Sequence, residues 1–331
     1  MGLSRQAGVA RTAAATGSRF FLHPVTAFIA VAALLLVILP AAFAGQSYWL
    51  TVFSNAALLA FASLGVWLTF SIGRINIAQG AFTLIGGYAT AILETHYGFP
   101  FVASLPLAAL VATLVGYAIG WPILRLKGVY FAMITLVLTE VATYAFLNGG
   151  SFTNAASGIT DIPRPALLAT SLDVYLASAV LLLIGVVVIW RFHVSPVGAV
   201  FRAMRQGEDL AASFGIDIAR YRLIAFVVSC AMGGIAGAMF AAVQQNVFPT
   251  SYSVNDSINF MLYCFLGGLE WVLGPVVGAF LLVVVFQLLS AIQQYQTLLY
   301  AILMIIVMLF LPNGILSLPR AIRAWRNRRT A

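Results

Sequence analysis

Residues that could do chemistry are scarce in this sequence, and the clearest candidate is a carboxylic acid within an apolar run. Glu140 lies near the middle of the run 129–147, five residues after Thr135. An acid at the centre of a membrane helix costs roughly 2.5–3.5 kcal/mol on insertion scales, so we expect its side chain to face the interior of a helix bundle. Two interpretations remain open: Glu140 lines a pathway through the membrane, or it makes a buried structural hydrogen bond.

A second group of polar residues opens another apolar run. Asn76, Gln79 and Thr83 recur at spacings of three and four, which would place all three on one face of a helix. Gly73 and Gly80 lie nearby, so the segment is either an interrupted helix that lines a cavity or a site of hydrogen bonding between helices. The candidate pathway residues are Asn76, Gln79, Thr83, Thr135 and Glu140.

No catalytic or metal-binding pattern accompanies these residues. Cys230 and Cys264 lie in separate apolar runs without a CxxC motif, and the three histidines are far apart in the sequence. The HExxH, GxSxG and phosphate-binding GxxxxGK[S/T] motifs are absent from the sequence. We therefore predict no catalytic residue, no metal site and no cofactor bound by this chain.

The composition places these residues in a lipid bilayer. Hydrophobic residues make up 62% of the 331 residues, charged residues only 8%, and the mean hydropathy is +1.02. A soluble domain carries about 25% charged residues, so this chain has too few to cover a globule in water. The net charge of +8 would suggest a nucleic-acid partner in a soluble protein, but the placement of the arginines gives it another meaning.

Ten apolar runs are candidate membrane helices, which need ~20 residues, although one of the ten is shorter. Each is read as a helix because lipid cannot satisfy open backbone polar groups. The runs are 25–44, 48–70, 77–93, 101–124, 129–147, 173–190, 223–243, 257–269, 274–291 and 297–312. The eighth is short and ends at Gly267-Gly268, so it either crosses fully or is re-entrant. The sequence predicts an all-α integral membrane protein with about ten transmembrane helices.

The basic residues predict the orientation of these helices. With the N-terminus in the cytoplasm, sixteen of the seventeen Lys and Arg residues fall on the cytoplasmic side and only Arg164 lies outside. Both termini are therefore predicted to be cytoplasmic, and a nucleic-acid partner is excluded. The predicted organisation is a basic segment 1–24, one polytopic domain 25–318 with an outside loop 148–172 and an inside loop 191–222, and a basic tail 319–331.

The first run has an alternative interpretation. It follows three arginines and ends in Ala42-Phe43-Ala44, which resembles a signal-peptide cleavage site. The apolar core of a signal peptide is ~7–15 residues long, and this run is longer, which favours a retained helix. The outside loop 148–172 is likewise open to two readings, either a connector or a lid and docking surface.

The inside loop 191–222 is too long for a simple connector of ~2–8 residues. Its apolar residues form one helical stripe, Val197, Val200, Phe201, Met204, Ala211 and Phe214. The charged residues mainly off this stripe are Arg202, Arg205, Glu208 and Asp209. A helix lying on lipid would carry fewer acids, so the mixed charge favours a docking helix for a soluble partner that ends near Gly215.

Several of these segments together resemble one family. They are Gly73–Phe82, Ile85–Tyr88, Leu124–Tyr130, Thr135–Glu140, Arg202–Ile216, Leu266–Gly268, Gly274–Pro275, Gly278–Ala279 and Leu311–Gly314. In this order, over roughly residues 50–318, they resemble the permease subunits of branched-chain amino acid ABC importers, specifically the longer of the two paired permeases.

The resemblance implies a set of partners in a bacterial inner membrane. A related permease, two cytoplasmic ABC ATPase subunits and a periplasmic solute-binding protein would complete the importer, and only the ATPase subunits would use ATP. The resemblance also implies an ATPase-coupling segment containing Arg202, Arg205, Glu208, Asp209, Ala211, Ala212 and Gly215. Movement of this segment would switch the helices between outward-open and inward-open states.

The substrate and two other protein classes stay open at this point. Branched-chain or other hydrophobic amino acids are the first expectation, with urea or amides and aromatic acids as alternatives within the same importer class. An ion-coupled secondary transporter is a weaker alternative, because one buried acid is little evidence for ion coupling and no convincing internal repeat is visible. A membrane enzyme is disfavoured by the missing catalytic motifs.

Overall fold

The computed structural model describes residues 28, 31–43, 45–126, 128–296, 298–299, 301–302, 305, 309 and 314–317. The chain separates into two compact units, Met1–Gly45 and Gln46–Ala331. The predicted terminal segments 1–24 and 319–331 lie outside the described residues, and so does most of the last predicted run, 297–312.

The described part of the first unit is helical. Its apolar stretch Val31–Phe43 falls within the first predicted run. A π-helical turn, Leu34–Ile38, precedes a short α-helix, α3 (Leu39–Phe43). The N–H of Leu39 reaches the carbonyl of Leu34, so the wider turn lies directly before Pro40, which has no N–H to donate.

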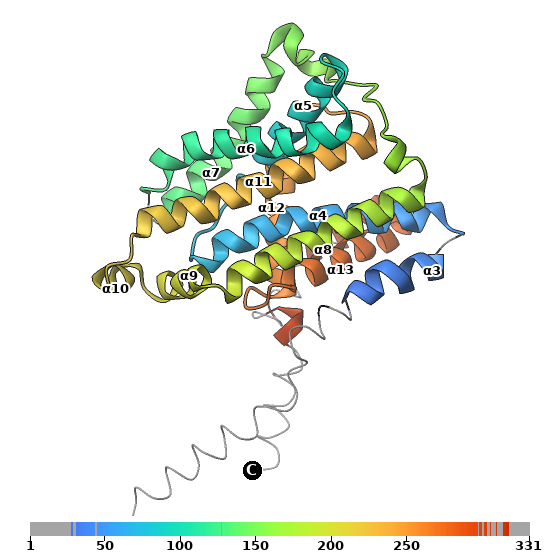
Figure 1. The fold of residues 1–331 in the computed structure, drawn as a ribbon. Coiled ribbons are helices and arrows are strands. Elements are labelled where there is room, and N and C mark those ends of the chain that lie inside the picture. Colours follow the sequence, from blue (N-terminus) through green and yellow to red (C-terminus); the bar gives the residue numbers. More distant parts are fainter. Residues whose placement is uncertain are drawn as a thin grey trace, which may run out of the picture. The chain divides into compact units, whose positions relative to one another are not determined.

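The second unit is built from helices packed side by side. They are α4 (Ser47–Ser71), α5 (Gln79–Thr95), α6 (Phe101–Ile123), α7 (Val129–Leu147), α8 (Ser171–Val194), α9 (Pro196–Gln206), α10 (Glu208–Ser213), α11 (Ile218–Gln244), α12 (Val254–Gly267) and α13 (Gly274–Leu289). In Figure 1, α11 and α4 run side by side through the middle of this unit, with α6 along α11 and α8 along α4. Short 3-10 turns are Gly150–Phe152, Ala155–Ser157, Ala166–Leu168, Ser290–Tyr295 and Ile315–Ser317.

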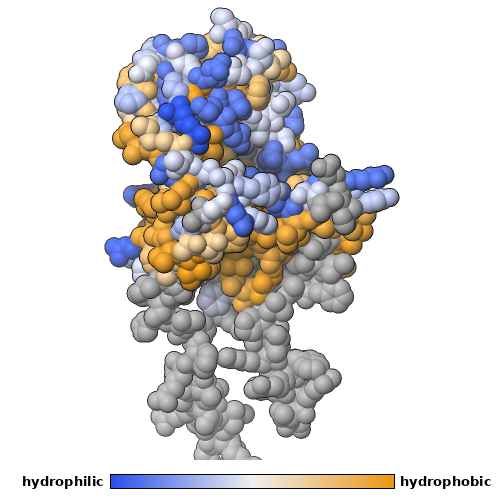
Figure 2. Space-filling view, turned by 90° about the vertical axis from the view of Figure 1, so that its right-hand side faces the viewer, coloured by the Kyte–Doolittle hydropathy of each residue, from blue (hydrophilic) through white to orange (hydrophobic). Residues whose placement is uncertain are grey.

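Five of these helices, α4, α6, α7, α8 and α11, are long and apolar enough to cross a bilayer. Helices α5, α12 and α13 have 17, 14 and 16 residues. A 14-residue helix is only ~21 Å long, less than the ~30 Å of a hydrocarbon core, so α12 still fits either a full or a re-entrant segment. Figure 2 shows broad hydrophobic areas on one face. The all-α, multi-pass membrane class is confirmed, while the number ten remains a prediction.

Glycines allow α5 and α11 to approach with their backbones in contact. A methyl group on Gly86 would overlap the carbonyl oxygen of Gly234, and one on Gly237 would overlap the carbonyl oxygen of Thr83. Membrane helices associate through such close packing because lipid offers no hydrophobic drive between them. The contact fixes the position of α5, the helix that carries two of the candidate residues.

The loop 148–172 is attached to the connection that follows α11. Ile159 and Val247 exchange two backbone hydrogen bonds of 2.9 Å each, and the N–H of Ile162 donates to the carbonyl of Gln245 at 3.2 Å. Gln245 ends α11 in a left-handed conformation with φ 57°. The loop is therefore tied to a second connection, and its exposed Phe152 and Leu167 leave the docking interpretation open.

The glycine contact gives a testable prediction. Gly237→Ala should destabilise the folded protein by about 1–3 kcal/mol, because the added methyl group forces α5 and α11 apart. The measurement is the fraction of monodisperse protein that remains after heating in detergent. Gly45→Ala is the matched control, since no atom lies within 4 Å of a methyl group there. Equal losses for the two variants would contradict the prediction.

Candidate functional site

A non-helical segment connects α4 and α5, the helices that correspond to the second and third predicted runs, and α5 itself is continuous. Helix α4 ends at Ser71, and the chain runs without helical structure until Gln79. Gly73 has φ +77°, a conformation that glycine adopts without strain. Asn76 lies in this non-helical segment, so the prediction that it shares a helix face with Gln79 and Thr83 is wrong, although all three side chains are fully buried.

Buried amide and hydroxyl groups stabilise the interrupted segment, residues 72–78. Oδ1 of Asn76 accepts a hydrogen bond from the N–H of Ala78 at 3.0 Å. The amide nitrogen of Gln79 donates to the carbonyl of Ala62 at 2.9 Å, and its Oε1 accepts from the hydroxyl of Ser229 at 3.0 Å. The bonds of Gln79 join the start of α5, directly after the segment, to α4 and α11. A polar group left without a partner among apolar helices would cost free energy.

Hydroxyl groups on α7 and α12 complete this network. The N–H of Ile77 donates to the hydroxyl oxygen of Thr135 at 3.2 Å, and the hydroxyl of Thr139 donates to the carbonyl of Ile77 at 3.0 Å. The N–H of Gly80 donates to the hydroxyl oxygen of Ser257 at 2.9 Å. Thr135, Thr139 and Ser257 are fully buried. The sequence analysis missed Ser229, Thr139 and Ser257, whose signal was a hydroxyl group inside an otherwise apolar run.

Glu140 is not part of this network. Helix α7 turns Phe131, Thr135 and Thr139 inward, and Glu140 is one residue further along, ~100° around the helix axis. Its side chain is exposed on the outer face of this unit beside Val141, which is 54% exposed. The prediction that Glu140 faces the interior of this chain's own helix bundle is wrong.

The loop 191–222 forms two helices where the sequence predicted one. Helix α9 ends at Gln206, Gly207 is extended, and α10 begins at Glu208. Phe201 and Met204 are buried on α9, whereas Phe214 is 78% exposed. The predicted apolar stripe therefore breaks at Gly207, and Phe214 lies outside it. The predicted stop is confirmed, because α10 ends at Ser213 and Gly215 has φ +80°.

Glu208 joins α10 to the interrupted segment and to α11. Its carboxylate accepts hydrogen bonds from Nε and Nη2 of Arg74 at 3.1 and 3.2 Å, and it also contacts Nη2 of Arg222. Both guanidinium groups also reach the turn between α6 and α7, where Arg222 donates to the carbonyl of Leu124 at 3.1 Å and Arg74 donates to that of Leu126. We call Arg74, Glu208 and Arg222 the arginine–glutamate cluster. It ties four separate parts of the chain together.

The arginine–glutamate cluster is largely buried. The side chains of Arg74, Arg222 and Glu208 are 4%, 9% and 24% exposed. Burial lowers the pKa of Arg74, the charge of Arg222 lowers it further, and Glu208 opposes both effects. A guanidinium group nevertheless stays charged in proteins, so one carboxylate is required between the two positive groups.

The predicted coupling residues divide into an exposed and a buried set. The exposed residues are Arg202, Arg205, Asp209, Ala212 and Gly215. Ala211 is buried and Glu208 is largely so. Leu210 is 63% exposed near Phe214, so α10 presents an apolar pair next to charged residues. The sequence analysis missed Arg74 and Arg222, which it counted only as positive-inside residues.

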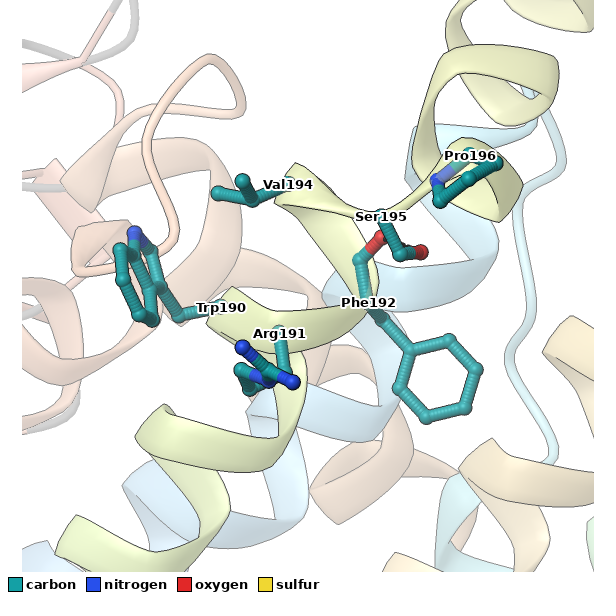
Figure 3. Close-up of a pocket in the computed structure, with 6 residues that line it drawn as sticks. All are labelled: Trp190, Arg191, Phe192, Val194, Ser195 and Pro196. Atoms are coloured by element: carbon teal, nitrogen blue, oxygen red, sulfur yellow. Dashed lines mark hydrogen bonds between the residues drawn. The ribbon is translucent and has the colours of Figure 1, made fainter.

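A hollow of about 430 Å³ lies where α8 meets α9 (Figure 3). It is lined by Trp190, Arg191, Phe192, Val194, Ser195 and Pro196. Nearby, Arg202 donates to the carbonyl of His193 at 2.7 Å, which holds α9 against the end of α8. Within the described part of the chain, no three His, Cys, Asp or Glu side chains gather where they could hold a metal ion.

Comparison with known proteins identifies the family. The family model described as "Branched-chain amino acid transport system / permease component" matches residues 47–311. The permease protein LivM of a high-affinity branched-chain amino acid transport system in Salmonella typhimurium strain LT2 is 31% identical over 275 residues. This match covers 75% of the chain and 65% of LivM, so the chain spans less than two thirds of that relative's length.

Two relatives from one archaeon, Methanocaldococcus jannaschii, are probable branched-chain amino acid transport permeases. LivH is 26% identical over 289 residues, which cover 80% of this chain and 89% of LivH. LivM is 26% identical over 245 residues, which cover 65% of this chain and 69% of that LivM. No solved structure matches the chain.

These findings define the class as a multi-pass membrane permease component of a transport system. The chain belongs to the family of branched-chain amino acid transport permeases, which confirms the resemblance carried by the sequence motifs.

The arginine–glutamate cluster gives a second prediction. Arg222→Ala should lower the free energy of opening α10 by about 1–3 kcal/mol. Breaking a fully buried ion pair costs ~3–5 kcal/mol, and the effect here is smaller because Glu208 remains partly exposed. The rate of hydrogen exchange at the α10 amides should rise by the factor that corresponds to this loss of free energy. The measurement is mass spectrometry on the protein in lipid nanodiscs.

Arg220→Ala is the control for this experiment. It removes the same charge two residues earlier on α11, from a side chain that is exposed. Exchange in α10 that rises equally in both variants would show that net charge, and not the contact with Glu208, stabilises the helix.

Proposed function

We propose that this chain is a membrane-spanning permease subunit of an ATP-binding-cassette importer in a bacterial inner membrane. It would form part of the pathway for branched-chain or other hydrophobic amino acids delivered by a periplasmic binding protein. ATP hydrolysis would occur on separate cytoplasmic subunits, and this chain would bind no cofactor. The observation that carries the proposal is the exposed surface of α10, which Glu208 links directly to the interrupted segment among the apolar helices.

The exposed surface of α10 fits a soluble protein partner. Leu210 and Phe214 project apolar side chains, and Arg205 and Asp209 lie exposed nearby with opposite charges. Exposed aromatic residues at the centre of a contact supply much of its binding energy when a partner covers them. A cytoplasmic ATPase subunit is the partner that we assign to this surface, which would lie on the cytoplasmic side in the orientation predicted from the basic residues.

The arginine–glutamate cluster offers a direct route for motion from the ATPase into the membrane. A displacement of α10 moves the carboxylate of Glu208, and Arg74 follows because two hydrogen bonds join them. Arg74 lies two residues before Asn76, whose neighbours are bound to α7 and α11. A shift of α10 therefore changes the interrupted segment, while Arg222 carries the same displacement to α11.

The candidate pathway residues take two roles in this proposal. The buried network around Asn76, Gln79 and Thr135 responds to the motion of α10, whereas Glu140 lies where a neighbouring subunit or the solute can reach it.

The importer is completed by a second related permease and a solute-binding protein. The loop 148–172, with Phe152 and Leu167 exposed, is the surface we assign to that binding protein.

Transport assays test this function and its substrate. Cells that lack this chain should lose saturable uptake of labelled leucine, and the full chain should restore it. Inactivation of the partner ATPase should abolish uptake, whereas a proton ionophore should not do so directly. Uptake of urea or an aromatic acid in place of leucine would overturn the substrate assignment, and ionophore-sensitive, ATPase-independent uptake would overturn the importer class.

A variant of α10 tests the coupling surface. Phe214→Ala should weaken binding of the ATPase subunit by about 2 kcal/mol or more, the usual effect of removing a central aromatic contact. The protein should still accumulate in the membrane, because Phe214 is 78% exposed and supports little of the fold. The measurement is the amount of ATPase retained when the importer is purified.

Phe99→Ala is the matched control. Phe99 is 43% exposed in the connection between α5 and α6, far along α5 from the arginine–glutamate cluster. Full retention of the ATPase by both variants would rule out α10 as the coupling surface.

A further inference from the structure

Three of the long helices, α6, α7 and α8, expose a broad face at the surface of the second unit, and the face of α7 differs in chemistry from the other two. On α6 the large exposed side chains are Val102, Leu110, Val111, Leu114, Tyr117 and Trp121. On α8 they are Leu172, Val180, Ile184, Val187, Val188 and Val194. No charged residue lies within α6, and those of α8 lie near its ends. Both faces suit lipid tails.

The exposed face of α7 carries an acid among its apolar residues. Met133 and Val137 precede Glu140 on this face, and Val141 and Tyr144 follow it, with exposures of 51–59% for the four apolar and aromatic side chains. Glu140 is exposed near the middle of the helix, and no hydrogen bond or ion pair joins it to another described residue. Lipid tails offer a carboxyl group no hydrogen-bond partner, so this face needs a different covering.

We propose that this face of α7 is the contact surface for the second permease of the importer, a different chain of the same family, and that Glu140 accepts a hydrogen bond from that chain. The proposal rests on the proposed function. A second copy of this chain fits less well, because a symmetric contact would bring two carboxyl groups into one interface, where their like charges oppose each other. Methanocaldococcus jannaschii has two different family members, LivH and LivM, both similar to this chain.

The inner face of α7 gives this contact a mechanical role. Thr135 and Thr139 bind the backbone of Ile77, so the helix that faces the partner also supports the interrupted segment. Glu140 adjoins Thr139 in sequence, and its attachment to the partner would fix the rotation of α7 about its own axis. A change in the interrupted segment is thereby passed to the interface between the two permeases through one helix.

Photo-crosslinking in the assembled importer tests the surface. A benzophenone amino acid at Val137 should capture a second multi-pass permease of this family, identified by mass spectrometry from native membranes. The same probe at Leu114, which is 58% exposed on α6, should give no protein adduct. Only lipid adducts at Val137, an adduct with a second copy of this chain, or capture of a soluble subunit would each overturn the proposal.

Substitution of the acid tests the hydrogen bond. With the probe at Val137, Glu140→Leu should lower the yield of the permease adduct at least about fivefold, because it removes an interhelical hydrogen bond within the membrane. Glu140→Gln keeps an accepting oxygen and should retain most of the yield. Equal yields for the two variants would overturn the role of Glu140.

Two readouts separate this proposal from the proposed function. ATP-driven uptake of leucine with only lipid adducts at Val137 would refute the interface and leave the importer function standing. Capture of the second permease with uptake that does not depend on the ATPase would refute the importer class and leave the interface standing.

Discussion

One carboxylate between two buried guanidinium groups is the interaction on which the rest of the described arrangement depends. Glu208 lies at the start of a six-residue helix that is too short to be stable by its own hydrogen bonds. Its contacts with Arg74 and Arg222 give that helix a fixed position. Each guanidinium group also donates to a carbonyl of the α6–α7 turn, so the carboxylate organises the ends of four helices at once.

A second constraint acts a few residues further along the chain. Apolar surroundings forbid open backbone polar groups, and residues 72–78 lie outside a regular helix, so other partners must satisfy them. The last turn of α4 accepts from the N–H groups of Ile72, Gly73 and Arg74, and Thr135 and Thr139 of α7 bond to the backbone of Ile77, so α7 keeps its register with the segment. The non-helical segment thus forms hydrogen bonds with distant parts of the sequence. Continuous apolar helices would not form these bonds, because their backbone groups are satisfied within each helix.

Local features of the sequence predicted much of the fold. Apolar runs coincide with α4, α6, α7, α8 and α11, because hydropathy and length are properties of each run alone. The helix stop near Gly215 was predictable for the same reason. Properties that depend on three-dimensional placement were not: Glu208 and Arg74 are 134 positions apart, and the outward direction of Glu140 depends on how α7 is rotated against its neighbours.

Helix α11 begins beside the arginine–glutamate cluster and ends at Gln244, close to the connection that the backbone pairing of Ile159 with Val247 holds in place. Its 27 residues give a rod of ~40 Å, and its backbone contact with α5 leaves few flexible side chains that could absorb bending. A rod of that length tilted by about 5° moves its far end by roughly 3.5 Å. A tilt of α11 that begins at the arginine–glutamate cluster would therefore move the loop 148–172 by more than the length of a hydrogen bond, although the loop and the cluster share no residue.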